Sequence, residues 1–241
     1  MRTPPQRTPL PGPAFIRLLA RLADVDVPPS PHSLPERLSQ WLDWNRAVAL
    51  SRALDASPAS PVAATSDLQA EAAEAARLRG ALTRAIVDMP ELAAPCADSE
   101  DPRPAAPDYA LFHKRYLARQ QAMQTATGML RGRLREQLAT RSPALARLAE
   151  IDAVMELTLG PREHTLLAAV PTLLGEHFQR LRQAALSAQG EAALAGRAPP
   201  AGNAWLELFG HDMQQLLLAE LDVRFHPIDA LLAALPPTGT S

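Results

Sequence analysis

The six histidines have the widest chemical range in this chain, because an imidazole can bind a metal ion or carry a proton near neutral pH. Two of them follow an acidic residue by four positions, as Glu207 with His211 and as Asp222 with His226, a spacing that puts both side chains on one helix face. A carboxylate metal site in a helical bundle would need Glu-x-x-His in two copies, and the sequence contains neither that motif nor His-Glu-x-x-His. We therefore interpret both pairs as surface ion pairs and predict no bound metal or other cofactor.

The side chains that could act as nucleophiles lack activating neighbours. Cys96 is the one cysteine, and it lies in an acidic, proline-rich stretch without a base beside it. Lys114 stands between two other basic residues, no Gly-x-Ser-x-Gly occurs, and the 11 glycines are scattered instead of forming a phosphate-binding loop. We predict that the chain is not an enzyme. The enzyme alternative would need distant helices to bring together side chains such as His164, His177 and His211.

Charge is distributed unevenly along the chain. Between residues 113 and 147 eight basic residues stand against one acidic residue, a net charge of +7, whereas residues 88–108 carry six acidic residues against one basic residue, a net charge of −5. On a helical wheel the arginines flank an apolar stripe, with Arg115, Arg119 and Arg133 on one side and Arg131 and Arg135 on the other. This arrangement is typical of arginine side chains whose aliphatic part covers apolar surface while the guanidinium group reaches water or neighbouring acids. Two other interpretations stay open, namely an acidic protein partner and the phosphates of a nucleic acid.

Two tryptophans define a further candidate surface. Trp41 falls in the middle of an apolar stripe, which predicts a core position. Trp44 falls at the edge of that stripe beside Arg46. It is either an anchor for another protein or a boundary residue that packs beneath the N-terminal helix.

The elements that must position these side chains are separated by the 24 prolines. Between the prolines, apolar residues recur every three to four positions, which is typical of amphipathic helices. Aromatic residues make up only 4% of the chain and β-branched aliphatics are also scarce, so a sheet is not expected. We predict an all-α fold, an irregular bundle of seven to eight helices with Pro-rich termini and one long internal loop. The helices are expected at about 15–27, 33–54, 67–89, 108–140, 143–159, 167–185, 203–222 and 227–235.

Capping residues predict where several helices begin. Ser33 and Glu36 form a capping box, in which each side chain accepts a backbone N–H of the other residue. Asp108 is expected to cap the longest helix, Ser142 the next one and Asn203 the helix 203–222. That last helix has apolar residues over more than half its circumference, which predicts burial on two sides, either in the core or against a partner.

Glycines and prolines predict where helices end or bend. Gly160 followed by Pro161 is the order expected at a helix C-terminus. Pro171 is expected to bend the helix that follows, and Pro227 to begin a separate short one. Gly128 and Gly132 are expected to weaken the longest helix and to kink it. Residues 57–66 and 189–202 are interpreted as a loop and a linker.

We expect a disordered Pro-rich tail at 1–13, one helical domain at 14–235 with a sub-boundary in the linker 90–107, and a second disordered tail at 236–241. The N-terminus has no apolar signal-peptide segment. The most apolar later stretch, 165–175, is too short to span a bilayer. We therefore expect a soluble cytoplasmic protein without membrane insertion.

Four stretches of amphipathic-helix sequence carry a family resemblance: Glu36–Trp44 with its tryptophan pair, Ile151–Glu156, Leu218–Asp222 and Leu231–Leu235. Over about residues 14–235 the chain resembles the proteobacterial family known as domain of unknown function 3348. The resemblance implies a bacterial, helical protein of uncharacterised function. Members of the family are encoded near membrane motor-like or outer-membrane-anchoring proteins. The resemblance therefore also implies an accessory role in a cell-envelope or motor-like complex. It supplies no functional residue.

From these patterns we predict a non-catalytic helical interaction or assembly protein, with a protein partner or a second copy of the chain as its target. The alternative is a nucleic-acid-binding module that uses the arginine-rich segment 114–147. The candidate partner-binding residues are Trp44, Arg115, Arg119, Arg131, Arg133 and Arg135.

Overall fold

The computed structural model describes residues 13–26, 33–55, 68–89, 108–196 and 203–235, and within these ranges it contains eight helices and no strands. The helices are α1 (Ala14–Ala23), α2 (Leu34–Trp41), α3 (Trp44–Asp55), α4 (Leu68–Val87), α5 (Tyr109–Ala139), α6 (Pro143–Ala168), α7 (Val170–Leu194) and α8 (Ala204–Ala233). The predicted all-α bundle of seven to eight helices is confirmed. Both predicted tails (except Pro13), the loop 57–66 (as part of 56–67) and the linker 90–107 with Cys96 lie outside the described residues.

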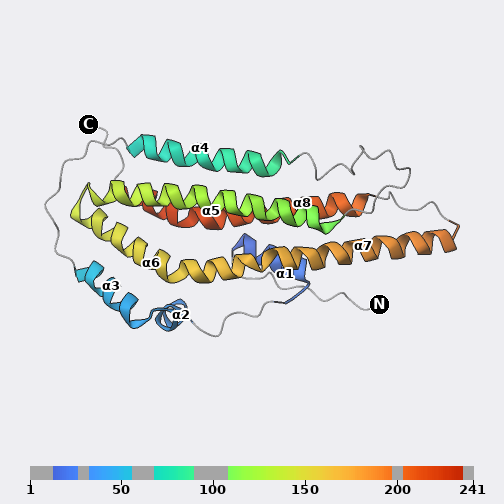
Figure 1. Cartoon of the computed structure of the whole chain (residues 1–241), viewed down its shortest axis with the longest axis horizontal. Coiled ribbons are helices and arrows are strands. Elements are labelled where there is room, and N and C mark those ends of the chain that lie inside the picture. The colour runs from blue at the N-terminus through green and yellow to red at the C-terminus, as the bar shows by residue number, and fades with distance from the viewer. Residues whose placement is uncertain (1–12, 27–32, 56–67, 90–107, 197–202, 236–241) are drawn as a thin grey trace, which may run out of the picture.

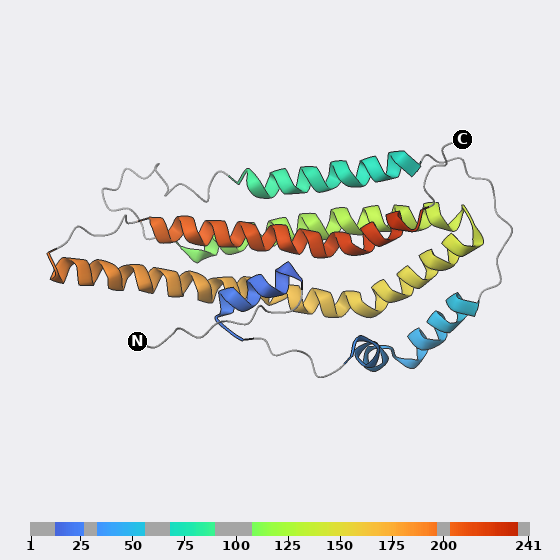
Figure 2. The same ribbon diagram turned by 180° about the vertical axis from the view of Figure 1, so that it is seen from behind.

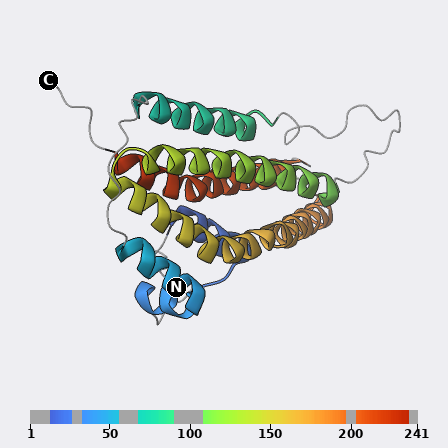
Figure 3. The ribbon, with the colours of Figure 1, turned by 60° about the vertical axis from the view of Figure 1, so that its left-hand side comes forward.

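The long helices are stacked in layers. α5 and α8 lie side by side in the middle, α4 packs against them on one side, and α6 followed by α7 packs on the other (Figure 1, and from behind in Figure 2). α1 packs on α7 and α8. Figure 3 shows α2 and α3 at one corner of the molecule, where α3 packs on α6. α8 is therefore the central element, since it contacts α1 and each helix from α4 to α7.

The burial of α8 on several sides follows from its wide apolar surface, which one neighbouring helix cannot cover. Phe209, Met213 and Leu216 have no exposed surface, and Phe225 and Ile228 are equally buried farther along the helix. The helix that was predicted to be buried on two sides is thus surrounded by the core of the chain itself.

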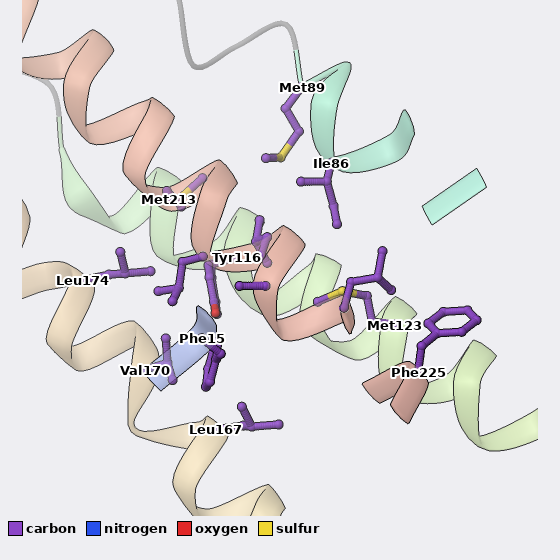
Figure 4. Close-up of a cluster of buried hydrophobic side chains, with 14 of the residues drawn as sticks. Phe15, Ile86, Met89, Tyr116, Met123, Leu167, Val170, Leu174, Met213 and Phe225 are labelled. Carbon is purple, nitrogen blue, oxygen red and sulfur yellow. The ribbon is translucent and has the colours of Figure 1, made fainter. Parts of the chain in front are cut away.

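Segments from both sides of residues 90–107 contribute to this core. Ile86 of α4 and Met89, two residues after the helix ends, belong to the same cluster of buried side chains as Met123 of α5 and Met213 of α8. Figure 4 shows these side chains together with residues of α6 and α7. The apolar stripes of helices distant in sequence therefore meet in one interior.

The predicted helix starts follow from capping hydrogen bonds. The Glu36 carboxylate accepts the N–H of Ser33 at 2.7 Å, and the Ser33 hydroxyl accepts the N–H of Glu36 at 3.5 Å. These bonds, the one from the Ser33 backbone first, lower the pKa of Glu36. The side chains of Asp108 and Ser142 also accept backbone N–H groups, at 3.1 and 3.2 Å. Asn203 holds the N-cap position of α8, but its side chain makes no capping hydrogen bond.

Two predicted helix ends in the N-terminal region are wrong. The helix predicted over 33–54 is broken into α2 and α3, because Leu42 is extended and Asp43 starts a new helix by accepting the N–H of Arg46 at 2.8 Å. α1 ends at Ala23, before the predicted Val27. Asp24 adopts a left-handed conformation with φ 53°, which stops the helix.

The predicted effects of the later prolines are also wrong. α6 continues through Gly160 and Pro161 to Ala168, and α8 continues through Pro227 to Ala233. Pro161 has no N–H for the carbonyl of Leu157, but Leu157 is exposed, so water can satisfy that oxygen. Figure 1 shows that α6 changes direction along its length, as a proline allows. In α8, burial on both sides of Pro227 outweighs its cost of about 3 kcal/mol.

The remaining differences concern α5 and α7. Pro171 lies in the first turn of α7, where a missing N–H costs nothing, so it does not bend a helix interior. α7 continues to Leu194, into the predicted linker 189–202. α5 runs without interruption through Gly128 and Gly132, where a kink was expected.

Candidate functional site

Arg131 and Arg135 of α5 form a charged cluster with Asp152 and Glu156 of α6. Arg131 donates from Nε and Nη2 to the two carboxylate oxygens of Asp152, at 2.8 and 2.7 Å. Arg135 donates to Asp152 at 3.3 Å and also to Glu156. Burial alone would lower the pKa of Arg131, but the hydrogen bond and charge of Asp152, with the charges of Glu156 and Glu163, raise it. Both arginines are thereby held by carboxylates of the same chain.

The other candidate arginines lie elsewhere on α5. Arg133 is 3.6 Å from Glu74 of α4, and Arg115 and Arg119 are half-buried. The hydrogen bond and charge of Arg77 lower the pKa of Glu74, and Arg133 adds a smaller effect in the same direction. Arg131, Arg133 and Arg135 therefore reach neighbouring acids, as the structural interpretation of the charge pattern expects. Binding of a partner by any of them stays a prediction.

α8 carries a carboxylate without exposed surface, Glu220. Tyr116 and Gln120 of α5 donate to its Oε2 at 2.7 and 3.2 Å, and Arg224 donates from Nε and Nη2 to its Oε1 at 2.9 and 2.7 Å. Gln120 also donates to the carbonyl of Leu167 at 3.1 Å. Burial, followed by the charge of Glu220, raises the pKa of Tyr116 well above its ordinary value. Figure 4 shows Tyr116 among the apolar side chains of the core.

This network was not predicted from the sequence, although the sequence contains a signal for it. Glu220 lies between apolar residues of a helix that is buried on several sides, and Arg224 follows it by four positions. A carboxylate at such a position must be paired to be stable, which predicts a buried ion pair.

A cavity of about 420 Å³ opens between α5, α6 and α8, next to the Glu220 network. Its apolar wall consists of Met155, Leu159, Leu167, Val223 and Pro227. Pockets of this size between the helices of a bundle are common sites for small ligands. The sequence could not reveal it, because its three walls come from segments up to about 100 positions apart.

Charged side chains line the same cavity. Arg131 of α5 and Arg224 of α8 contribute positive charges, and Glu156 and Glu163 of α6 contribute negative ones. His164 is exposed and also belongs to the lining. The cavity therefore combines an apolar wall with charges of both signs.

The three histidines of the enzyme alternative do not share this cavity. His164 lines it, whereas His177 of α7 lies 3.0 Å from Asp212 of α8 through Nε2. His211 is exposed on α8. Asp212 also accepts a hydrogen bond from Arg21 of α1 at 3.1 Å, so the His177 contact belongs to a cluster that ties α1 to α7 and α8.

The acid–histidine pairs at four-residue spacing are on the surface. Glu207, His211, Asp222 and His226 are all exposed, and neither pair forms a salt bridge in this described helix. Among the residues that the structure describes, no group of three or more histidine, cysteine, aspartate or glutamate side chains is arranged to hold a metal ion. Within the same ranges, no helix combines the length and apolar character needed to cross a bilayer.

Trp44 lies at the first position of α3 and is 80% exposed. Trp41, at the end of α2, is half-buried, and the guanidinium of Arg162 from α6 lies 5.1 Å from its ring centre. Trp41 is therefore packed at the boundary of the bundle and not in the core. The alternative in which Trp44 packs beneath the N-terminal helix is wrong.

The fold defines an all-α protein, a bundle with a charged cavity between three of its helices. The chain belongs to the family described as "Protein of unknown function (DUF3348)", whose family model matches residues 1–236. No curated protein and no solved structure matches this chain.

Proposed function

We propose that this is a non-catalytic helical interaction protein that binds a partner protein through the corner formed by α2 and α3, with Trp44 as the anchor. The observation that carries the proposal is the 80% exposure of the Trp44 side chain. Tryptophan is the residue type most enriched among the side chains that dominate binding energy, because a large indole gains much from entering a pocket.

The structure around Trp44 supports this role. Asp43 accepts both the backbone N–H of Arg46 at 2.8 Å and a hydrogen bond from its guanidinium at 2.9 Å, which fixes the start of α3. α3 packs on α6, and the Arg162–Trp41 contact also joins this corner to α6. Trp44 is thus presented on an ordered helix start, which lowers the entropy cost of binding.

The partner we propose is a protein with an apolar pocket that accepts the indole. We further propose that the complex is cytoplasmic and is accessory to a cell-envelope or motor-like assembly, as the family resemblance implies. The rival proposal is nucleic-acid binding through residues 114–147. The pairing of Arg131 and Arg135 with Asp152 and Glu156 favours the protein partner, because a phosphate would have to displace those carboxylates.

The test is affinity capture from an extract of the source cells with three forms of the protein: wild type, Trp44→Ala and Leu194→Ala. Leu194 is the matched control, an apolar side chain on α7 that is 91% exposed. We expect one partner to be retained by the wild type and by Leu194→Ala and to be lost with Trp44→Ala. Partners that bind all three forms equally would refute the role of Trp44.

Two further measurements separate the alternatives. Light scattering of the wild type and of Trp44→Ala shows whether the partner is a second copy of the chain. A mobility shift with DNA and RNA at low salt tests the rival, since phosphate binding must weaken steeply as salt rises. Salt-sensitive binding that Trp44→Ala leaves unchanged would favour the nucleic-acid function over our proposal.

A further inference from the structure

We propose that the cavity between α5, α6 and α8 binds a small organic amine, with one ammonium group on an apolar body. This inference concerns a second site and does not depend on the role of Trp44. It rests on the charged groups of the cavity that are already paired, on those that are not, and on the open space beside two glycines.

The positive charges of the cavity are already neutralised. Arg131 uses Nε and Nη2 on Asp152, and Arg224 uses Nε and Nη2 on Glu220, which is fully buried. The Nε/Nη2 edge of each guanidinium group, which can bind an anion through two parallel hydrogen bonds, is therefore occupied. An anionic ligand would have to compete with the carboxylates that already neutralise these arginines.

The negative charge of Glu163 is not neutralised in this way. Glu163 lines the cavity and is half-buried, and the described part of the chain supplies it with no hydrogen bond or salt bridge. Its charge acts on Arg131 only at longer range. A carboxylate in this position lacks a directly bound cation, which an ammonium group would supply.

A backbone oxygen adds a second acceptor. Val223 and Pro227 of α8 both line the cavity. Because Pro227 has no N–H, the carbonyl of Val223 loses the donor that an uninterrupted helix would provide. An ammonium group carries three donors, so after binding a carboxylate it still has donors for an acceptor such as this carbonyl.

The total charge of the site matches one ammonium group. The lining and its direct partners contain three arginines and four acidic residues, so that one negative charge is in excess when histidine is neutral. These residues are Arg131, Arg135, Arg224, Asp152, Glu156, Glu163 and Glu220. A ligand with a single positive charge restores neutrality, whereas a dication would be repelled by the arginines.

Two glycines provide the space. A Cβ atom added to Gly128 of α5 or to Gly160 of α6 would meet no atom within 4 Å, and both residues line the cavity. The remaining wall is apolar, with Met155, Leu159 and Leu167. The ligand we infer is therefore an aryl- or alkylamine whose apolar part packs against α6.

The test measures by ligand-observed NMR the affinity of the full chain for 2-phenylethylamine, 2-phenylethanol and 3-phenylpropionate. These probes share a skeleton and differ in charge. We expect the amine to bind at least about tenfold more tightly than the alcohol, because a hydrogen bond to a charged group is the stronger one, and the carboxylate to bind least. Equal binding of the three probes, preference for the carboxylate, or no binding of the amine would each overturn the proposal.

Three variants locate the site. Gly160→Leu should fill the cavity and abolish amine binding, whereas Gly132→Leu, which also meets open space but does not line the cavity, should leave it unchanged. Glu163→Gln should weaken amine binding about tenfold or more and leave alcohol binding unchanged. Circular dichroism confirms that each variant is folded, and amine binding that is unchanged in a folded Gly160→Leu and Glu163→Gln would refute the site.

Discussion

Replacement of Glu220 by methionine should be among the most destabilising single substitutions in this protein. The carboxylate has no exposed surface and accepts four hydrogen bonds, two of them from Arg224, whose side chain is only 8% exposed. Without Glu220 the Arg224 charge remains buried and unpaired, and the donors of Tyr116 and Gln120 lose an acceptor. Removal of one partner of a buried ion pair costs about 3–5 kcal/mol.

The loss should be visible in both thermal and urea unfolding. For a chain of this length each kcal/mol lowers Tm by about 2–4 °C, so that Glu220→Met should lower Tm by roughly 6–20 °C. The double variant Glu220→Met with Arg224→Met removes both charges and should recover more than half of the loss. Glu74→Met is the exposed control, because salt bridges on the surface are screened by water and contribute little to stability.

The measurement is urea unfolding followed by circular dichroism and by tryptophan fluorescence, with coincident transitions taken as the test of two-state behaviour. A Glu220→Met protein within about 1 kcal/mol of the wild type would refute the argument that this carboxylate holds a buried charge. A double variant as unstable as the single one would show that the unpaired Arg224 is not the cause.

Three further predictions follow from single contacts. Burial raises the pKa of Tyr109 to about 12 and that of Tyr116 well above 10, and these are the two tyrosines of the chain. The absorbance of tyrosine phenolate should therefore stay flat through pH 10 in the folded protein, whereas it should rise at this pH in urea. Because the unfolded state loses these protons first, the stabilisation should be complete below pH 10 and be lost as the pH rises toward 12; half-ionised tyrosines at pH 10 in the folded chain would contradict this. Gly175→Ala should lower the free energy of unfolding in urea by about 1–3 kcal/mol, because its Cβ would lie 2.9 Å from the Tyr109 ring. Gly132→Ala, where the Cβ would meet open space, should raise it by about 0.5–1 kcal/mol. Equal stabilities of the two variants would show that the Tyr109 ring moves freely. Trp44→Phe should remove most of the tryptophan fluorescence that iodide quenches, and unchanged quenching would mean that the indole is covered in solution.

Features set by neighbouring residues could be predicted from the sequence. The start of α5 at Tyr109 could be predicted, because its N-cap Asp108 and its apolar stripe lie within a few turns of one another. The ends of α6 and α8 could not be predicted from Pro161 and Pro227. There the cost of a proline is local, whereas the burial that outweighs it comes from helices distant in sequence.

The candidate site was less accessible to sequence reasoning. Arg131 and Arg135 are four positions apart, as are Asp152 and Glu156, so their complementary faces could have been matched. The donors to Glu220 from α5 lie about 100 positions away, and the cavity is lined by residues of three different helices. Such features depend on how the helices are arranged, which no short motif records.

The central position of α8 has a consequence for biosynthesis. α8 lies C-terminal to every helix that packs on it, so the nascent chain emerges from the ribosome with the parts of the apolar stripes of α1 and α4 to α7 that pack on α8 still exposed to water. Until the segment 204–233 has been translated and released, these stripes are available to chaperones and proteases. Products of premature termination upstream of Ala204 would have no means of closing the bundle, and the cell's quality control should remove them.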